Sequence, residues 1–294
     1  MLFNSTFVKG LQLAGLLAFF ACKSKEPPKP PPPDPLAVQL VSPGAEPKRL
    51  LRYALPKGTA MPFELALDAS ITTGGLGGAM PTFVFDLDLY VEDVMPDGRM
   101  ALKTTIADAT ARDRPEEKVE AKALAGRVAT IKGLTITSTL TPDGKLEGVK
   151  VDTAKLPETA AQQAASLAQS FEHIAMPLPT VPVGVGAKWT TIRELDQGGM
   201  KSSAINTVEI TAIAGDKISF KLETQIHGPA QTVVQQNVPI EVNALSGSGG
   251  GSGTLDLGHF VMFGELDATL HADMTAQGQR STLDLEMKTT ITSR

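Results

Sequence analysis

Residues 83–92 have the sequence FVFDLDLYVE, in which apolar side chains alternate with mostly polar ones. The apolar positions are Phe83, Phe85, Leu87, Leu89 and Val91. Successive side chains of a β-strand point to opposite faces, so this period of two predicts a strand with one apolar and one wet face. Strands of this kind are typical of antiparallel sheets that bury only one face.

The same alternation returns through most of the chain beyond residue 48, above all at 218–227, 266–274 and 283–291. Weaker patterns predict further strands at 61–71, 99–108, 127–140, 145–151, 188–195, 203–213, 231–242 and 254–263. Pro-Asp-Gly at 96–98 and at 142–144 predicts tight turns, because proline presets φ and glycine accepts a positive φ. The glycine-serine tract at 246–253 is interpreted as a flexible hairpin loop.

One stretch, 157–176, has a helical period instead. Its apolar positions are Ala160, Ala164, Leu167, Phe171 and Ile174. Pro157 suits a first helical turn and Pro177 ends the pattern. We therefore expect a mainly β (α+β) fold, a curved antiparallel sheet or half-barrel. It is built from two β-rich halves, about 48–155 and 183–294, with this central Ala-rich helix packed on it.

Residues 1–21 have the features of an export signal, with Lys9 followed by an apolar run that is shorter than the roughly 20 residues of a membrane-spanning helix. The run ends at Ala21-Cys22, which resembles the bacterial lipobox, although Phe19 stands where that motif usually has leucine. The resemblance implies that Cys22 is acylated, for example with palmitate, and anchors the mature chain in a membrane. The alternative is an ordinary secretory signal with a chance cysteine, and a secreted protein.

Residues 22–47 comprise this cysteine and a proline-rich linker. Seven of the thirteen residues from Lys23 to Pro35 are proline. Proline lacks a backbone N–H, so the segment is expected to form an extended stalk that precedes a single domain at 48–294. Lys23, rather than aspartate, follows the cysteine. By the lipobox resemblance this implies the outer membrane of the cell envelope, with the domain facing the periplasm.

Two motifs resemble an uncharacterised family of bacterial secreted lipoproteins. Leu51-Arg52-Tyr53 followed by Lys57-Gly58 matches its RY…KG opening, and PTVPVGVGAKW at 179–189 matches its P-x-x-P-V-x-V-G-x-x-W segment. The family has no established activity, so the resemblance implies no catalytic residue. At the level of the fold alone, the layout is also similar to periplasmic lipoprotein carriers, whose curved sheet wraps a helix around an apolar cavity.

The composition limits the partners and the kinds of site that the protein can have. Hydrophobic residues make up 42% of the chain and the net charge is -5, which argues against nucleic acid as a partner. A single cysteine excludes an internal disulfide and a thiolate zinc site. The histidines are His173, His227, His259 and His271. They form no metal-binding motif; His259 is expected in the core or at a bulge, and could face His271 across a hairpin. Asp86/Asp88 and Asp284/Glu286 are interpreted as solvated pairs.

These observations leave two functions open. In the first, the domain is not an enzyme, uses no cofactor or metal, and binds a lipid or other apolar ligand between sheet and helix. The expected lining is Phe171, Ile174, Met176 and Trp189. In the second, it is an envelope scaffold with a filled core that presents a sheet edge or polar face to a protein partner.

Overall fold

The structure is a computed structural model that describes residues 38–294 except 116, 118, 154–174, 198 and 236–237. The predicted helix at 157–176 therefore lies, apart from its last two residues, outside the described residues, as do Cys22, Phe171 and Ile174. The strands are β1 (Gln39–Ser42), β2 (Ala60–Thr73), β3 (Leu76–Ala79), β4 (Thr82–Val94), β5 (Met100–Arg112), β6 (Thr135–Leu140), β7 (Leu146–Val151), β8 (Lys188–Gln197), β9 (Met200–Ala214), β10 (Lys217–Gly228), β11 (Gln231–Gln235), β12 (Val238–Asp256), β13 (His259–Ala276) and β14 (Gln279–Ser293).

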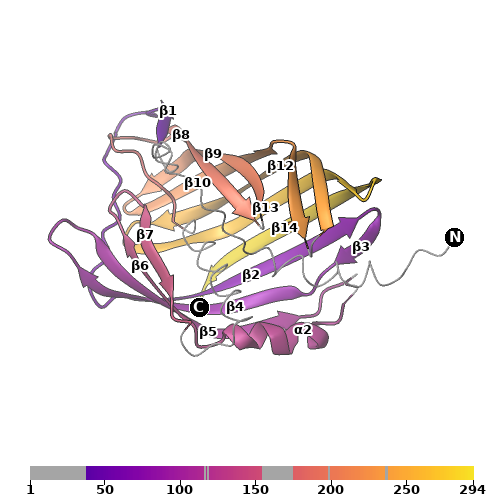
Figure 1. Cartoon of the computed structure of the whole chain (residues 1–294). Coiled ribbons are helices and arrows are strands. Elements are labelled where there is room, and N and C mark those ends of the chain that lie inside the picture. Colours follow the sequence, from indigo (N-terminus) through magenta and orange to yellow (C-terminus); the bar gives the residue numbers. More distant parts are fainter. Residues whose placement is uncertain (1–37, 116, 118, 154–174, 198, 236–237) are drawn as a thin grey trace, which may run out of the picture.

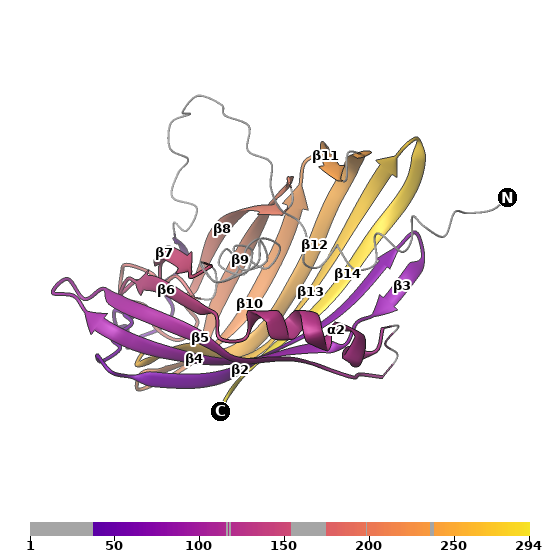
Figure 2. The same ribbon diagram turned by 60° about the horizontal axis from the view of Figure 1, so that its bottom comes forward.

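All the strands belong to one antiparallel sheet, in the order β1-β8-β9-β10-β12-β13-β14-β2-β4-β5-β6-β7, with β3 beside β2 and β11 beside β12. Figure 1 shows the sheet bending into an open trough, with β12, β13 and β14 at the back and β2, β4 and β5 along the bottom. Figure 2 shows the same trough after a turn of 60°. The predicted curved antiparallel sheet is confirmed.

The two halves of the chain meet inside this sheet. Residues 283–293 of β14 pair with residues 63–73 of β2, so the last strand of the second half lies beside the first long strand of the first half. Within each half the strands mostly follow one another as hairpins. The chain is therefore one continuous sheet rather than two packed ones.

One long strand is interrupted between β10 and β11 without losing its register against β12. β10 and β11 both pair with β12, through Gly228 opposite Leu245 and then Gln231 opposite Val242. Pro229 lies in the gap, where its missing N–H breaks the ladder. The predicted strand at 231–242 is thus wrong, because that range crosses the hairpin between β11 and β12. The range 254–263 likewise crosses a turn at 257–258.

Two further expectations are corrected. Where a strand was expected at 127–140, the chain forms α2 (Ala121–Val128) and a 3-10 turn (Ala129–Ile131) before β6. Ala121, Leu124 and Val128 are the buried residues of α2, and their spacing is helical. α2 contacts β5, and β6 pairs with residues 100–105 of the same strand.

The glycine-serine tract at 246–253 is not a loop but the middle of β12. It pairs on one side with β10 and on the other with β13. Four of its glycines sit where a side chain would meet the neighbouring backbone. A Cβ at Gly247, Gly249, Gly251 or Gly253 would collide with a carbonyl oxygen of β13. Glycine here permits a close approach of two strands.

The segment 49–55 crosses one end of the trough and fills it. Leu51, Tyr53 and Leu55 are almost completely buried. The Tyr53 amide donates to the Pro142 carbonyl at 2.9 Å, and its hydroxyl donates to the Met176 carbonyl at 3.1 Å. Burial raises the pKa of Tyr53 well above its usual value of 10. The tyrosine of the RY motif thus holds this segment in the core.

Candidate functional site

The apolar face of the sheet is its concave face. One core cluster joins Trp189 of β8 with Leu102 of β5 and Leu140 of β6, although these strands lie toward opposite ends of the sheet. Such contacts require that the apolar face curls toward itself. A second, smaller cluster joins Met200, Val233, Val242, Leu245 and Ala272.

Between the two clusters lies a band of apolar side chains that belongs to neither core. We call it the apolar band; its members are Ile71, Ile226, Leu266, Ala268, Leu285 and Met287. Cross-strand register puts all six on the concave face. They are half-buried, except Met287, which is 39% exposed. The glycines of β12 lie among them and have no side chain, so the backbone of β12 forms the surface between the apolar side chains.

The band is wide enough for a hydrocarbon chain. It spans β10, β12, β13, β14 and β2, and neighbouring strands lie about 4.8 Å apart, so it is about 19 Å across. One lipid leaflet contributes about half of the roughly 30 Å hydrocarbon core of a bilayer. A lipid tail therefore matches the width of the band.

Polar groups stand on the same concave face beside the band, on β8, β9 and β10. Arg193 lies opposite Ala204, and Thr191 lies opposite Asn206. The Thr224 hydroxyl donates to Oδ1 of Asn206 at 2.7 Å, which leaves the amide N–H groups of Asn206 as donors. The trough thus combines an apolar floor with a group of hydrogen-bond donors at one side.

Two of the four predicted ligand-lining residues are described, and both lie in the main core. Trp189 is completely buried, and its indole N–H donates to the Pro177 carbonyl at 3.0 Å. Met176 is 5% exposed. A role in ligand binding stays a prediction for both residues.

The convex face carries a polar hollow of about 350 Å³ over β12, β13 and β14. Ser246, His271 and Asp284 stand directly opposite one another there. Nδ1 of His271 lies 2.6 Å from Asp284, and this hydrogen bond raises the histidine pKa above its ordinary value.

The order of these three residues is that of a hydrolase triad, but the surroundings differ. The other ring nitrogen of His271 lies 3.5 Å from Asp273, and no hydrogen bond to Ser246 is found among the described residues. Oxyanion stabilisation needs free N–H donors, whereas the backbone here is engaged in the sheet ladder. The geometry supports a polar surface rather than acyl transfer.

The expected pairing of His259 with His271 is wrong, because both residues lie on β13 and cannot face each other across a hairpin. Of the two positions expected for His259, the core is excluded, because its side chain is 58% exposed and lies 3.3 Å from Asp256. The other is borne out, since His259 pairs with Asp256 where the register of β12 and β13 shifts. Asp88 is exposed as expected, whereas Asp86 is half-buried, and both carboxylates are paired with Arg294, at 2.6 Å for Asp86 and 2.7 Å for Asp88.

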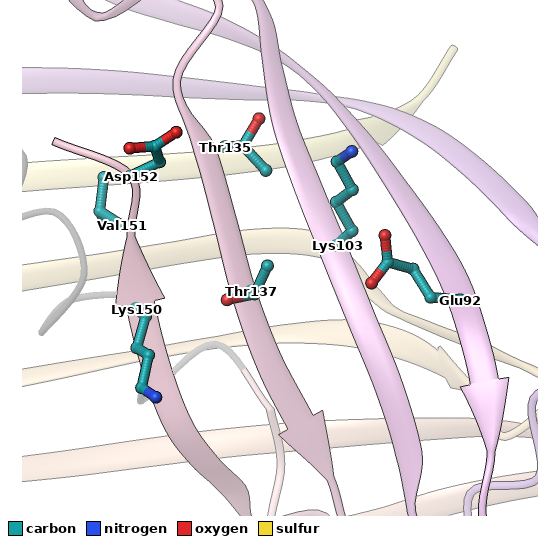
Figure 3. A pocket seen from close by; sticks show the side chains of 7 residues that line it. All are labelled: Glu92, Lys103, Thr135, Thr137, Lys150, Val151 and Asp152. Carbon is teal, nitrogen blue, oxygen red and sulfur yellow. The ribbon is translucent and has the colours of Figure 1, made fainter. Parts of the chain in front are cut away.

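A second hollow of about 370 Å³ lies over β4–β7, where Figure 3 shows the side chains of Glu92, Lys103, Thr137 and Lys150 on neighbouring strands. Charges of both signs line it, so it favours no single class of ligand. In the described part of the chain, no cluster of three or more histidine, cysteine or acidic residues is arranged to hold a metal ion. None of the described helices has the length and hydrophobicity to cross a membrane.

Comparison with family models, with curated proteins and with solved structures finds no significant match for this chain. The candidate site therefore rests on its own geometry. Sequence reasoning missed Arg193, although the alternation in KWTTIREL at 188–195 places Trp189, Thr191, Arg193 and Leu195 on one face. An arginine in phase with a buried tryptophan was the available signal.

Proposed function

We propose that this protein binds a lipid or other apolar ligand on the concave face of its sheet, without catalysis, in the bacterial cell envelope. The observation that carries the proposal is the apolar band. Its half-buried apolar side chains belong to neither core cluster, and apolar surface outside a core often marks a binding site. The concave placement of the band and the glycine backbone of β12 suit a flexible hydrocarbon chain.

The proposed tether follows from the N-terminal sequence. Cys22 would carry the acyl chains, and the proline-rich linker would hold the domain away from the bilayer. Two or more acyl chains give a stable anchor, whereas one is marginal. We place the protein at the outer membrane, facing the periplasm.

A second function is favoured by a different observation. Both polar hollows lie on the convex face, which fits an envelope scaffold that uses its wet face to contact a protein partner. In that case the concave face serves only as core. The two functions predict different effects of a charge placed on the apolar band: weaker ligand binding in the first and unfolding of the domain in the second.

Leu266→Glu tests this difference. A carboxylate in the band leaves the sheet intact if the band is an open surface, but it would oppose an apolar ligand, because burying an unpaired charge is costly. We expect binding of N-phenyl-1-naphthylamine, a probe that fluoresces in apolar surroundings, to weaken by about tenfold or more. Titration of the purified Cys22→Ser chain measures this.

The matched control is Glu265→Gln, one residue away on the convex face of β13. It should leave probe binding unchanged. If Leu266→Glu binds the probe as the parent does, the apolar band is not the binding site. If instead it unfolds the domain, the scaffold function with a filled core is favoured.

A further inference from the structure

Arg193 is the one charged side chain that β8 directs to the concave face. It stands opposite Ala204 of β9, which in turn stands opposite Ile226 of β10. The same row continues through Gly247, Leu270, Leu285 and Ile71. A guanidinium therefore lies at one end of a line of apolar and small residues that runs from β8 to β2.

This guanidinium has no partner among the described residues. Its Nε is shielded from solvent without a hydrogen-bond acceptor, and no ion pair or hydrogen bond joins Arg193 to the described part of the chain. Burial lowers its pKa to about 10, with no carboxylate opposing the shift. Nε of Arg49 is shielded in the same way, but the guanidinium of Arg49 pairs with Asp216. Arg99 pairs with Asp97, and Arg294 pairs with Asp86.

An anionic group of a ligand would supply the partner that Arg193 lacks among the described residues. Arg193 is half-buried and its Nε is shielded from solvent, and a charge that is partly removed from water is stabilised by a partner of opposite sign. Arginine binds carboxylate and phosphate through two parallel hydrogen bonds. Asn206 lies diagonally across from Arg193, and its amide N–H groups are also hydrogen-bond donors that suit an anion.

We propose that the trough binds an anionic amphiphile, with its acidic headgroup on Arg193 and its hydrocarbon chain along the row toward Ile71. This rests on the proposed function and adds the ligand's charge and orientation. The shared chemistry is a carboxylate or phosphate attached to a long alkyl chain. A neutral amphiphile would fill the floor but leave the guanidinium unpaired.

The test compares two probes that have the same chain, dodecanoate and dodecanol, by calorimetric titration of the Cys22→Ser chain below the concentration at which the probes aggregate. The parent should bind dodecanoate more tightly than dodecanol. Arg193→Gln should weaken dodecanoate binding by about ten- to a hundredfold, as expected for losing hydrogen bonds to a charged group. Its dodecanol affinity should stay within about twofold, since the apolar contacts remain.

Arg112→Gln, an exposed arginine of β5, is the matched control and should change neither affinity. Arg193→Lys should retain part of the preference for dodecanoate, and it serves if the glutamine variant does not fold. Equal binding of both probes by the parent, or undiminished dodecanoate binding by Arg193→Gln, overturns the headgroup assignment while leaving the apolar site in place. Binding of neither probe by the parent contradicts the proposed function itself.

Discussion

Gly251→Ala is expected to lower the free energy of unfolding by about 3 kcal/mol, the upper part of the range for forcing extra atoms into a packed structure. The added methyl group would collide with the Glu265 carbonyl and press on Leu266. Both belong to β13, which is held by ladders on its two sides, so neither can move without shifting the sheet. Urea denaturation followed by circular dichroism measures the loss.

Gly250→Ala is the control for this substitution. It lies next to Gly251 on the convex face, where the nearest atom to a new Cβ is the Leu222 carbonyl oxygen at 3.0 Å. A shift of a few tenths of an ångström accommodates it, so the cost should stay below about 1 kcal/mol. Equal effects of the two substitutions would show that general strand propensity, rather than close approach to β13, explains the glycines.

Cys22→Ser should move the protein from the membrane fraction to the soluble fraction of an exporting bacterial host. A serine hydroxyl cannot replace the thiol in the acylation that the lipobox resemblance implies, and without acyl chains the anchor is lost. Fractionation followed by immunoblotting measures the distribution.

Ser24→Ala changes a neighbouring residue beyond the expected lipidation site and should leave the protein with the membranes. Persistent sedimentation of the Cys22→Ser chain with membranes would contradict the anchor. Release of both variants would mean that the linker, rather than the cysteine, controls the attachment.

Much of the fold follows from the side-chain period, because a sheet with one wet face imposes alternation along each strand. The stretch 83–92 illustrates this, since the alternating Phe83, Phe85, Leu87, Leu89 and Val91 all lie on the concave face of β4. The glycine tract was misassigned because glycine is permissive in isolation, and only its neighbours β10 and β13 make its small size a requirement. α2 was missed because its eight residues provide barely two turns of pattern.

The candidate site was less accessible to sequence reasoning. A band formed from five strands depends on cross-strand register, which no local pattern specifies. Ala268 and Met287 come from different strands and stand opposite each other only through the pairing of β13 with β14. The sequence singles out Trp189 through the PTVPVGVGAKW segment at 179–189. Its neighbour on the same face, Arg193, was not singled out, because an arginine in a strand is normally assigned to water.

The central claim is that the concave face holds a lipid, and native mass spectrometry of the Cys22→Ser chain purified without detergent from a bacterial host tests it most directly. The account predicts protein ions that carry one or a few adducts with the mass of an acidic lipid, which disappear on denaturation and decrease in Leu266→Glu. A spectrum of ligand-free protein under gentle conditions, unchanged after incubation with vesicles of anionic phospholipid, would contradict it.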